Sequence, residues 1–318
     1  MKKVLPIAIC SSLSILAVLP AYAGGPIDGK VYGKLNLGLY SVDNGTDDVW
    51  EVNSAASRLG FKGKTELSEG LNVIYKVEYE ISADEGDFAD DELKARNMFA
   101  GLSGNFGSMI IGRNDTPFKL AQGKIDQFND LPGGDIKNLV RGENRIDDIV
   151  MYKTPDFNGF TVTGLIQPGE GRTNGDGETE DGVSDSTSIS VNYKSDALTV
   201  AVAFDDNVKA YDAARIVAMY KTGPFGIGGL WQESEASVGS NTEAKDGFIL
   251  SAFYKIGDFK LKAQLGESDE KSEGRTQSAL GADYKLGKQT KTFVYLSSLE
   301  DDADYQEDVF GLGLEHKF

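Results

Sequence analysis

The feature that most constrains this sequence is an alternation of apolar and polar residues that recurs, in segments of about ten residues, along almost the whole chain. A period of two is that of a β-strand, in which successive side chains point to opposite faces. In one such segment the apolar positions are Leu71, Val73, Tyr75, Val77 and Tyr79. Charged side chains of the same segment, such as Lys76 and Glu78, fall on the opposite face. The pattern predicts an all-β protein whose strands each have one apolar and one polar face.

The connections between these segments are of two kinds that alternate along the chain. Seven are short, at 67–70, 103–106, 155–159, 195–197, 222–225, 256–258 and 286–289. Eight are mostly longer and rich in acids, at 41–55, 83–92, 114–145, 168–186, 205–212, 233–246, 267–275 and 300–308. Fifteen connections predict sixteen antiparallel strands. Short turns at one end and long loops at the other are typical of a transmembrane β-barrel of the bacterial outer membrane, and a barrel of this size encloses an aqueous channel.

The first 23 residues have the features of a secretory signal peptide. Lys2 and Lys3 precede an apolar run over 4–19, and Ala21 and Ala23 form a small-residue cleavage site. We therefore expect 1–23 to be cleaved and 24–318 to form a single outer-membrane barrel domain. The single cysteine, Cys10, leaves with the leader, so the mature chain must fold without a disulfide. Closure of the sheet meets that need, because it leaves no unpaired strand edge in lipid.

Residue counts argue against several functional classes. The net charge of −18 argues against a nucleic-acid partner, whose phosphates require a basic surface. One cysteine excludes a cysteine-based zinc site. The single histidine, His316, lies near the chain end at a lipid-facing position, so a Ser–His–Asp hydrolase is not expected and neither is any other enzyme. After the N-terminus, no segment has the 18 consecutive apolar residues of a membrane-spanning helix.

The acids are concentrated in the predicted loops. Seven segments hold 33 acids and 6 bases, whereas the rest of the mature chain holds 17 acids and 24 bases; the segments are 41–52, 83–94, 168–186, 205–212, 233–246, 267–275 and 300–308. A solvated loop surface accounts for such acids. A negative rim that enriches cations near the channel mouth is the functional alternative. We expect no cofactor, although Ca²⁺ or Mg²⁺ could bind between the acidic loops.

The longest connection, 114–145, is the candidate constriction. Loops of this length in compact proteins are functional or disordered, and its apolar residues favour order, with a helical turn near 117–128. Its acids include Asp115, Asp126, Asp130 and Asp135. Bases at inward-facing strand positions are Lys34, Arg58, Arg96 and Arg113. If the loop folds inward, acids facing bases create a transverse field across the channel; the alternative is that they pair and fix the loop to the wall.

Several motifs occur in an order that resembles the general trimeric porins of Gram-negative bacteria. They are Val31–Lys34, Ser57–Gly63, Arg96–Leu102, Phe106-Gly107, Ile111–Asn114, Leu131–Asp135 and the terminal Phe318. The resemblance covers the whole mature chain. It implies a sixteen-stranded barrel, a homotrimer in the outer membrane, and a third loop folded into the pore.

The resemblance also implies roles for individual residues. The basic wall would comprise Lys34, Arg58, Arg96 and Arg145, and the opposing acids would be Asp130 and Asp135. Phe318 would be the signal read by the barrel-assembly machinery, and lipopolysaccharide would be a lipid partner. Enteric members usually have two more residues between Pro132 and the glycine pair. Their absence here puts the size and selectivity of the pore in question.

These features predict passive diffusion of small hydrophilic solutes and ions, with a preference for cations. A substrate-specific channel for sugars or anions is the alternative within the same class of barrel. A sugar channel should line its path with aromatic side chains, whereas most Tyr and Phe residues here fall at lipid-facing positions. An anion channel should show inward lysines without opposing acids.

Overall fold

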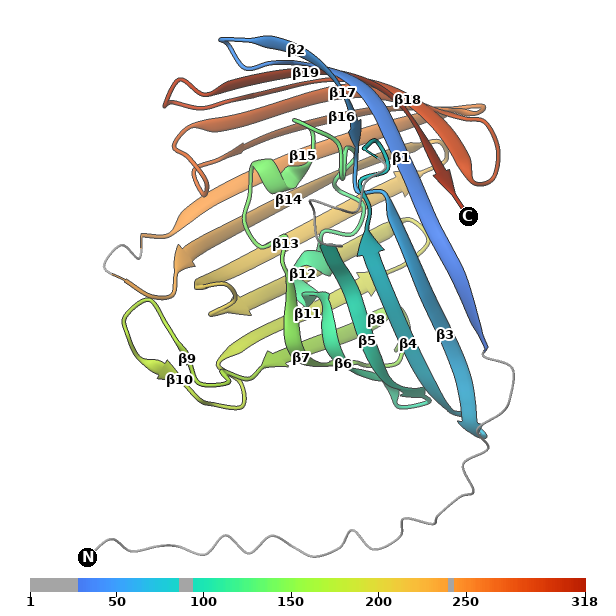
Figure 1. The fold of residues 1–318 in the computed structure, drawn as a ribbon, viewed down its shortest axis with the longest axis vertical. Helices are drawn as coiled ribbons and strands as arrows, with labels where there is room; N and C mark the ends of the chain where they lie inside the picture. Colours follow the sequence, from blue (N-terminus) through green and yellow to red (C-terminus); the bar gives the residue numbers. More distant parts are fainter. Residues whose placement is uncertain (1–27, 86–93, 240–242) are drawn as a thin grey trace, which may run out of the picture.

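A computed structural model describes residues 28–85, 94–239 and 243–318 as a ring of antiparallel strands (Figure 1). The predicted leader and parts of the predicted connections 83–92 and 233–246 lie outside these ranges. The strands are β1 (Gly29–Asp43), β2 (Asp48–Ser54), β3 (Arg58–Ser68), β4 (Leu71–Glu80), β5 (Lys94–Gly104), β6 (Gly107–Asp115), β7 (Arg145–Lys153), β8 (Phe160–Gln167), β9 (Arg172–Thr173), β10 (Thr179–Glu180), β11 (Ser186–Lys194), β12 (Leu198–Asp206), β13 (Tyr211–Thr222), β14 (Phe225–Ala236), β15 (Lys245–Ile256), β16 (Phe259–Ser268), β17 (Arg275–Lys285), β18 (Thr290–Glu300) and β19 (Gln306–Lys317).

The main sheet closes on itself as a barrel of sixteen strands. β2 and β3 are two halves of one barrel strand, because both pair with β1: Leu37 lies opposite Ser54 in β2, and Lys34 lies opposite Arg58 in β3. β9 and β10 form a separate hairpin within one connection. The ring is closed by β1 and β19, which pair antiparallel over ten residue pairs. The predicted all-β fold and strand number are confirmed.

The two faces of each strand follow the alternation in the sequence. In β1, Val31 and Leu39 are 65% and 42% exposed on the outer face, whereas Lys34 and Asn36 are buried on the inner face. Exposed large apolar side chains recur along most strands. An outward apolar band is what a lipid bilayer requires of a transmembrane barrel.

The connections at the two ends of the barrel differ as predicted, although several outer strands extend beyond the predicted limits. The turns at one end, such as 105–106 and 223–224, contain as few as two residues. At the other end, the chain between β1 and β2 has only residues 44–47, and that between β12 and β13 only 207–210. Many acids predicted to lie in loops therefore lie on strand ends; Asp205 is buried on β12.

The connection between β6 and β7, residues 116–144, is here termed L3 and lies inside the barrel, where Figure 1 shows it in green. It begins with the helix α1 (Pro117–Ala121), and a 3₁₀ turn, η1 (Ile136–Asn138), follows later. Thr116 caps α1 by accepting a hydrogen bond from the Lys119 backbone N–H. Pro117 suits the first turn because a backbone N–H at that position would have no partner within the helix. The predicted helical turn is thus shorter than expected. None of the described helices is long and apolar enough to cross a membrane.

L3 is attached to the inner wall by an apolar seam. Its buried side chains pack against small and aliphatic residues of β12–β15; on the L3 side the seam comprises Phe118, Ala121, Ile125, Ile136, Leu139 and Val140. A second cluster joins Phe128 and Leu131 of L3 to Tyr40 and Tyr295 of the wall. Because burial of such side chains contributes about 1.5–3 kcal/mol each, the seam explains how a loop of this length has a defined position.

Glycines of the wall make room for this seam. A Cβ atom at Gly266 would lie 2.4 Å from Leu139 Cδ2, and one at Gly228 would lie 2.6 Å from Ile125 Cδ1. A glycine within a strand can ease the bending of a curved sheet. At Gly228 the structure supplies a more specific reason, since a larger residue would collide with L3.

Candidate functional site

The tip of L3 separates two polar cavities inside the barrel. The loop-side cavity has a volume of about 440 Å³ and includes Arg96, Arg145 and Glu80 in its lining. The turn-side cavity has a volume of about 530 Å³ and includes Lys34 and Arg58. Residues 129–131 of L3 line both cavities. The narrow part of the barrel is therefore built around the L3 tip.

Asp130 is the acid that meets the basic wall directly. Its Oδ2 lies 2.8 Å from Lys34 Nζ and 2.8 Å from Arg58 Nη2. Burial alone would raise the pKa of Asp130, but attraction to these two bases outweighs it and keeps the pKa below its ordinary value. Asp130 has a φ of +69°, a backbone conformation that places its side chain toward the wall at a cost in strain. The acid and the bases pair, so the contact fixes L3 as well as charging the constriction.

The other predicted bases pair with acids of the wall. Arg96 contacts Glu78, with Nε 3.1 Å from Oε1, and also forms an ion pair with Glu80. Arg145 Nη2 lies 2.9 Å from Asp115 Oδ1. Arg96 and Arg145 line the loop-side cavity, and their guanidinium groups remain the positive groups of its wall.

Arg113 and Asp115 do not line either cavity. Arg113 lies at an irregularity in the β6–β7 pairing, between Gly112 and Asn114, and contacts Asp147, with Nη1 3.4 Å from Oδ2. Asp115 Oδ1 forms ion pairs with Lys119 Nζ at 3.2 Å and with Arg145 Nη2 at 2.9 Å. The extra residue of this bulge is in β7, and β6 keeps its register with β5 through Arg113. Ile111, two residues earlier in β6, is exposed on the outer face, so the alternation does not support the inward position predicted for Arg113.

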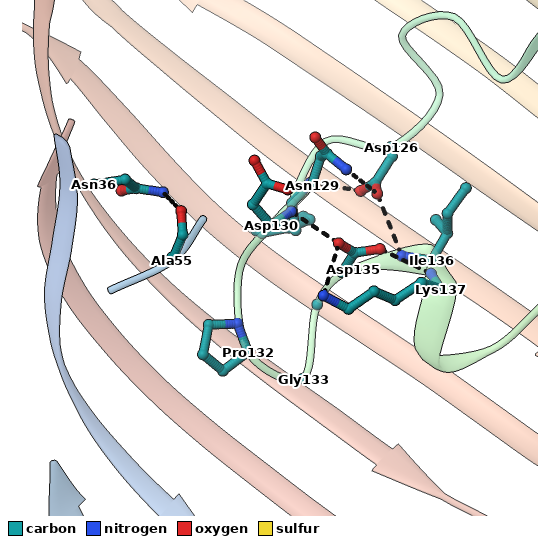
Figure 2. A network of polar contacts seen from close by, with 12 residues as sticks. Asn36, Ala55, Asp126, Asn129, Asp130, Pro132, Gly133, Asp135, Ile136 and Lys137 are labelled. Atoms are coloured by element: carbon teal, nitrogen blue, oxygen red, sulfur yellow. Dashed lines mark hydrogen bonds and ion pairs between the residues drawn. The ribbon is translucent and has the colours of Figure 1, made fainter. Parts of the chain in front are cut away.

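Asp126 and Asp135 serve the internal structure of L3 rather than facing the basic wall (Figure 2). Asp135 accepts hydrogen bonds from the backbone N–H groups of Asp130 and Lys137, at 2.9 and 2.8 Å. Asp126 accepts from the N–H groups of Phe128 and Ile136. Burial and the nearby charge of Asp135 raise the pKa of Asp126 well above its ordinary value. Of the four predicted loop acids, only Asp130 contacts the predicted bases Lys34 and Arg58.

A buried ionic network holds the returning limb of L3 to the wall. Arg215 of β13 is fully buried; its Nη1 lies 2.8 Å from Glu143 Oε1, and its Nε donates to Gln232. Gln232 in turn donates to Glu270, whose carboxylate accepts the Arg141 backbone N–H. Burial raises the pKa of Glu143 despite its attraction to Arg215. A buried base of this kind is stable only when its hydrogen bonds are satisfied.

Several groups that shape the channel were not predicted from the sequence. Glu78 is buried. Its carboxylate accepts hydrogen bonds from the Tyr32 hydroxyl and from Arg96 Nε, and it forms an ion pair with Lys76. Glu78 and Lys76 both fall on the polar face of the alternating pattern in this strand, and that pattern is the signal that could have identified Glu78. The network around Arg215 gave no such signal, because it joins β13, β14 and two connections that lie far apart in sequence.

Among residues 28–85, 94–239 and 243–318, no group of three or more acidic, histidine or cysteine side chains is arranged to hold a metal ion. The terminal Phe318 pairs with Gly33 through two backbone hydrogen bonds, of 3.0 and 3.2 Å, and is about half exposed. Its predicted recognition by the assembly machinery stays a prediction.

Comparison with known proteins gives a consistent family. A family model described as Gram-negative porin matches residues 12–304. The chain is 26% identical over 343 positions to the major outer membrane protein P.IB of Neisseria meningitidis, covering 95% of this chain and 97% of that protein. It is also 26% identical over 334 positions to outer membrane porin protein 32 of Delftia acidovorans, covering 96% and 92%.

Solved structures share the fold. The anion-selective porin from Comamonas acidovorans superposes with a TM-score of 0.73 at 21% identity, covering 91% of this chain and 99% of that one. A trimer form of OmpT from Vibrio cholerae superposes with a TM-score of 0.63 at 17% identity, covering 91% and 99%. At these identities the likeness concerns the fold of the barrel.

Proposed function

Because the chain belongs to the Gram-negative porin family, we propose that it forms a channel for passive diffusion of small hydrophilic solutes and ions, with a preference for cations. Porin relatives of the outer membrane place the protein in that membrane and among channels rather than enzymes. The observation that carries the proposal is the pair of cavities on either side of the L3 tip, both lined largely by charged and amide side chains.

The preference for cations rests on the outer end of the barrel. The seven acidic segments hold 33 acids against 6 bases. We expect this excess to raise the local concentration of cations at the loop-side mouth. The loop-side cavity adds five carboxylates against four bases in its lining. A solute that enters from the loop side therefore meets negative charge before it reaches the bases of the constriction.

A sugar-specific channel is less well supported. Inward aromatic side chains do occur in the wall, but Tyr40, Phe293 and Tyr295 are at most 2% exposed, because Phe128 and Leu131 of L3 pack against them. Such rings are not free to stack on a sugar. An anion-specific channel would fit the name of one structural neighbour, but the acids at the loop-side mouth oppose it.

A homotrimer is part of the proposal. Porins of the same fold include a trimer form, and the outer apolar band offers surface for contact with both lipid and neighbouring subunits. The same proposal includes lipopolysaccharide bound at the acidic loops, with Ca²⁺ or Mg²⁺ between the negative charges. It also includes recognition of Phe318 by the barrel-assembly machinery.

Liposome swelling tests the diffusion function. Purified protein reconstituted into liposomes should admit small sugars and amino acids at rates that fall smoothly as solute size increases. A rate that saturates with concentration for one solute, while others of equal size are excluded, would instead show a substrate-specific channel. Liposomes that do not swell with any small solute would contradict the proposal altogether.

A further inference from the structure

The turn-side cavity has an excess of positive charge. Seven bases and five carboxylates line it, whereas in the loop-side cavity the acids are in excess. The two cavities therefore present opposite net charges to a solute passing along the channel. A cavity with low-dielectric walls focuses the field of such an excess.

Most acids of the turn-side cavity are already neutralised. Asp130 pairs with Lys34 and Arg58. Asp283 pairs with Lys262 at 3.0 Å and with Lys291 at 3.2 Å. These acids each have two basic partners, so they do not compensate further bases in the cavity.

Two lysines are left without a carboxylate. Within the part of the chain that the structure describes, Lys124 of L3 and Lys260 of β16 form no ion pair within 4.0 Å, and both line the turn-side cavity. Gln127 connects them: its Oε1 accepts Lys260 Nζ at 2.8 Å, and its Nε2 donates to the Lys124 backbone oxygen at 2.6 Å. Lys260 Nζ and the Lys124 backbone therefore lie on either side of Gln127, and both residues line the cavity.

We propose that the turn-side cavity binds a doubly charged phosphate group between Lys124 and Lys260. Two ammonium groups without acidic partners match a dianion, and charge-assisted hydrogen bonds from Lys to phosphate oxygens are short and strong. The neighbouring Lys262 and Lys291 share Asp283, so they add positive potential. Asp126 also lines the cavity, but its carboxyl group is engaged by the backbone N–H groups of Phe128 and Ile136. A monovalent anion would leave one of the two lysines uncompensated.

The phosphate can come from two sources with the same chemistry. It can be the free inorganic ion or the monoester of a small hydrophilic solute, and in both the phosphoryl group would occupy the lysine site. The proposal does not depend on the overall preference for cations, which arises at the opposite mouth. Phosphate binding in the turn-side cavity gives the channel a second specificity, for phosphoryl groups, at the end of the barrel with the short turns.

Block of the potassium current tests the site. Protein reconstituted in planar bilayers at about pH 7.5, where most of the phosphate is a dianion and the lysines carry their charge, is titrated with inorganic phosphate and, separately, with glycerol phosphate at constant ionic strength. We expect inorganic phosphate to reduce the current, and Lys260→Gln and Lys124→Gln each to raise the half-blocking concentration about tenfold. Block by glycerol phosphate as well would assign the site to phosphoryl groups in general, and its absence would assign it to the free ion.

Lys288→Gln is the matched control. Lys288 is exposed in the turn between β17 and β18 at the same end of the barrel, but it does not line the cavity. An equal shift in this variant, or no block of the wild-type channel beyond that of chloride, would overturn the phosphate site. A channel that does not conduct in KCl before phosphate is added would contradict the diffusion function instead.

Discussion

Oδ2 of Asp130 lies 2.8 Å from Nη2 of Arg58, so the tip of L3 is tied by an ion pair to the second strand of the barrel. The same oxygen contacts Lys34. One carboxylate therefore positions the loop and sets the charge at the boundary between the two cavities. Its removal should change ion selectivity more than removal of an acid at the rim.

Asp130→Asn tests this contact. The variant leaves Lys34 and Arg58 without their acid, so the cation-to-anion permeability ratio should fall roughly fivefold, the effect of about 1 kcal/mol at short range. Reversal potentials in a salt gradient measure the ratio. Asp47→Asn removes the same charge from the exposed outer connection between β1 and β2 and should have a much smaller effect. Equal effects of the two variants would contradict a special role of Asp130.

Arg96→Gln should act in the opposite direction. It leaves Glu78 and Glu80 without one basic partner in the wall of the constriction, so the channel should become more selective for cations, by about threefold to fivefold. Lys209→Gln, on an exposed outer connection, is the control. A shift toward anions in the Arg96 variant would show that the carboxylates are not exposed to permeating ions.

The glycines under L3 allow a stability test. Gly266→Ala places a Cβ 2.4 Å from Leu139, which should destabilise the native barrel by about 1–3 kcal/mol through overpacking. Urea unfolding followed by tryptophan fluorescence measures the loss. Gly164→Ala adds the same methyl group within β8, where nothing lies within 4 Å of it, and should leave stability nearly unchanged. Equal losses of stability in the two variants would indicate a general intolerance of strand substitutions rather than an effect on the packing of L3 against the wall.

The buried acids of L3 predict a pH dependence of its attachment. The pKa values of Asp126 and Glu143 are raised in the folded state by burial, so their contribution to stability is greatest at low pH and is lost as pH rises through the raised pKa values. The pKa of Asp130 is lowered by its bases, despite its burial, so its contribution is lost only as pH falls below the ordinary carboxyl range. Between these limits L3 should become better protected as pH falls from neutral.

Hydrogen exchange measures this protection. Amides of 126–136, corrected for intrinsic exchange rates, should exchange more slowly at about pH 5.5 than at about pH 8, and Asp126→Asn should remove much of the difference because it cannot ionise. Asp47→Asn should retain it. Faster exchange at the lower pH would contradict the assignment of Asp126 as an acid that folding favours in its protonated form.

The barrel could be predicted from sequence, because alternation and turn length are local properties. The ion pairs and hydrogen bonds of the constriction could be predicted only in part. Lys34 and Arg58 were placed correctly on the inner face, but the role of Asp135 depends on hydrogen bonds within a folded loop. The structure does not support the inward position predicted for Arg113, because Ile111, two residues earlier in the same strand, is exposed on the outer face. No sequence pattern indicates a role for Lys260, because that role depends on which carboxylates pair with the neighbouring lysines in the folded barrel.

The reversal potential of the wild-type channel in a potassium chloride gradient tests the central claim most directly. A water-filled channel with an acidic outer mouth should conduct and should give a potential of the sign that indicates preference for K⁺ over Cl⁻. The preference should weaken at high salt, because the Debye length falls to about 3 Å at 1 M. Absence of conductance, or a potential of the opposite sign at low salt, would contradict the account.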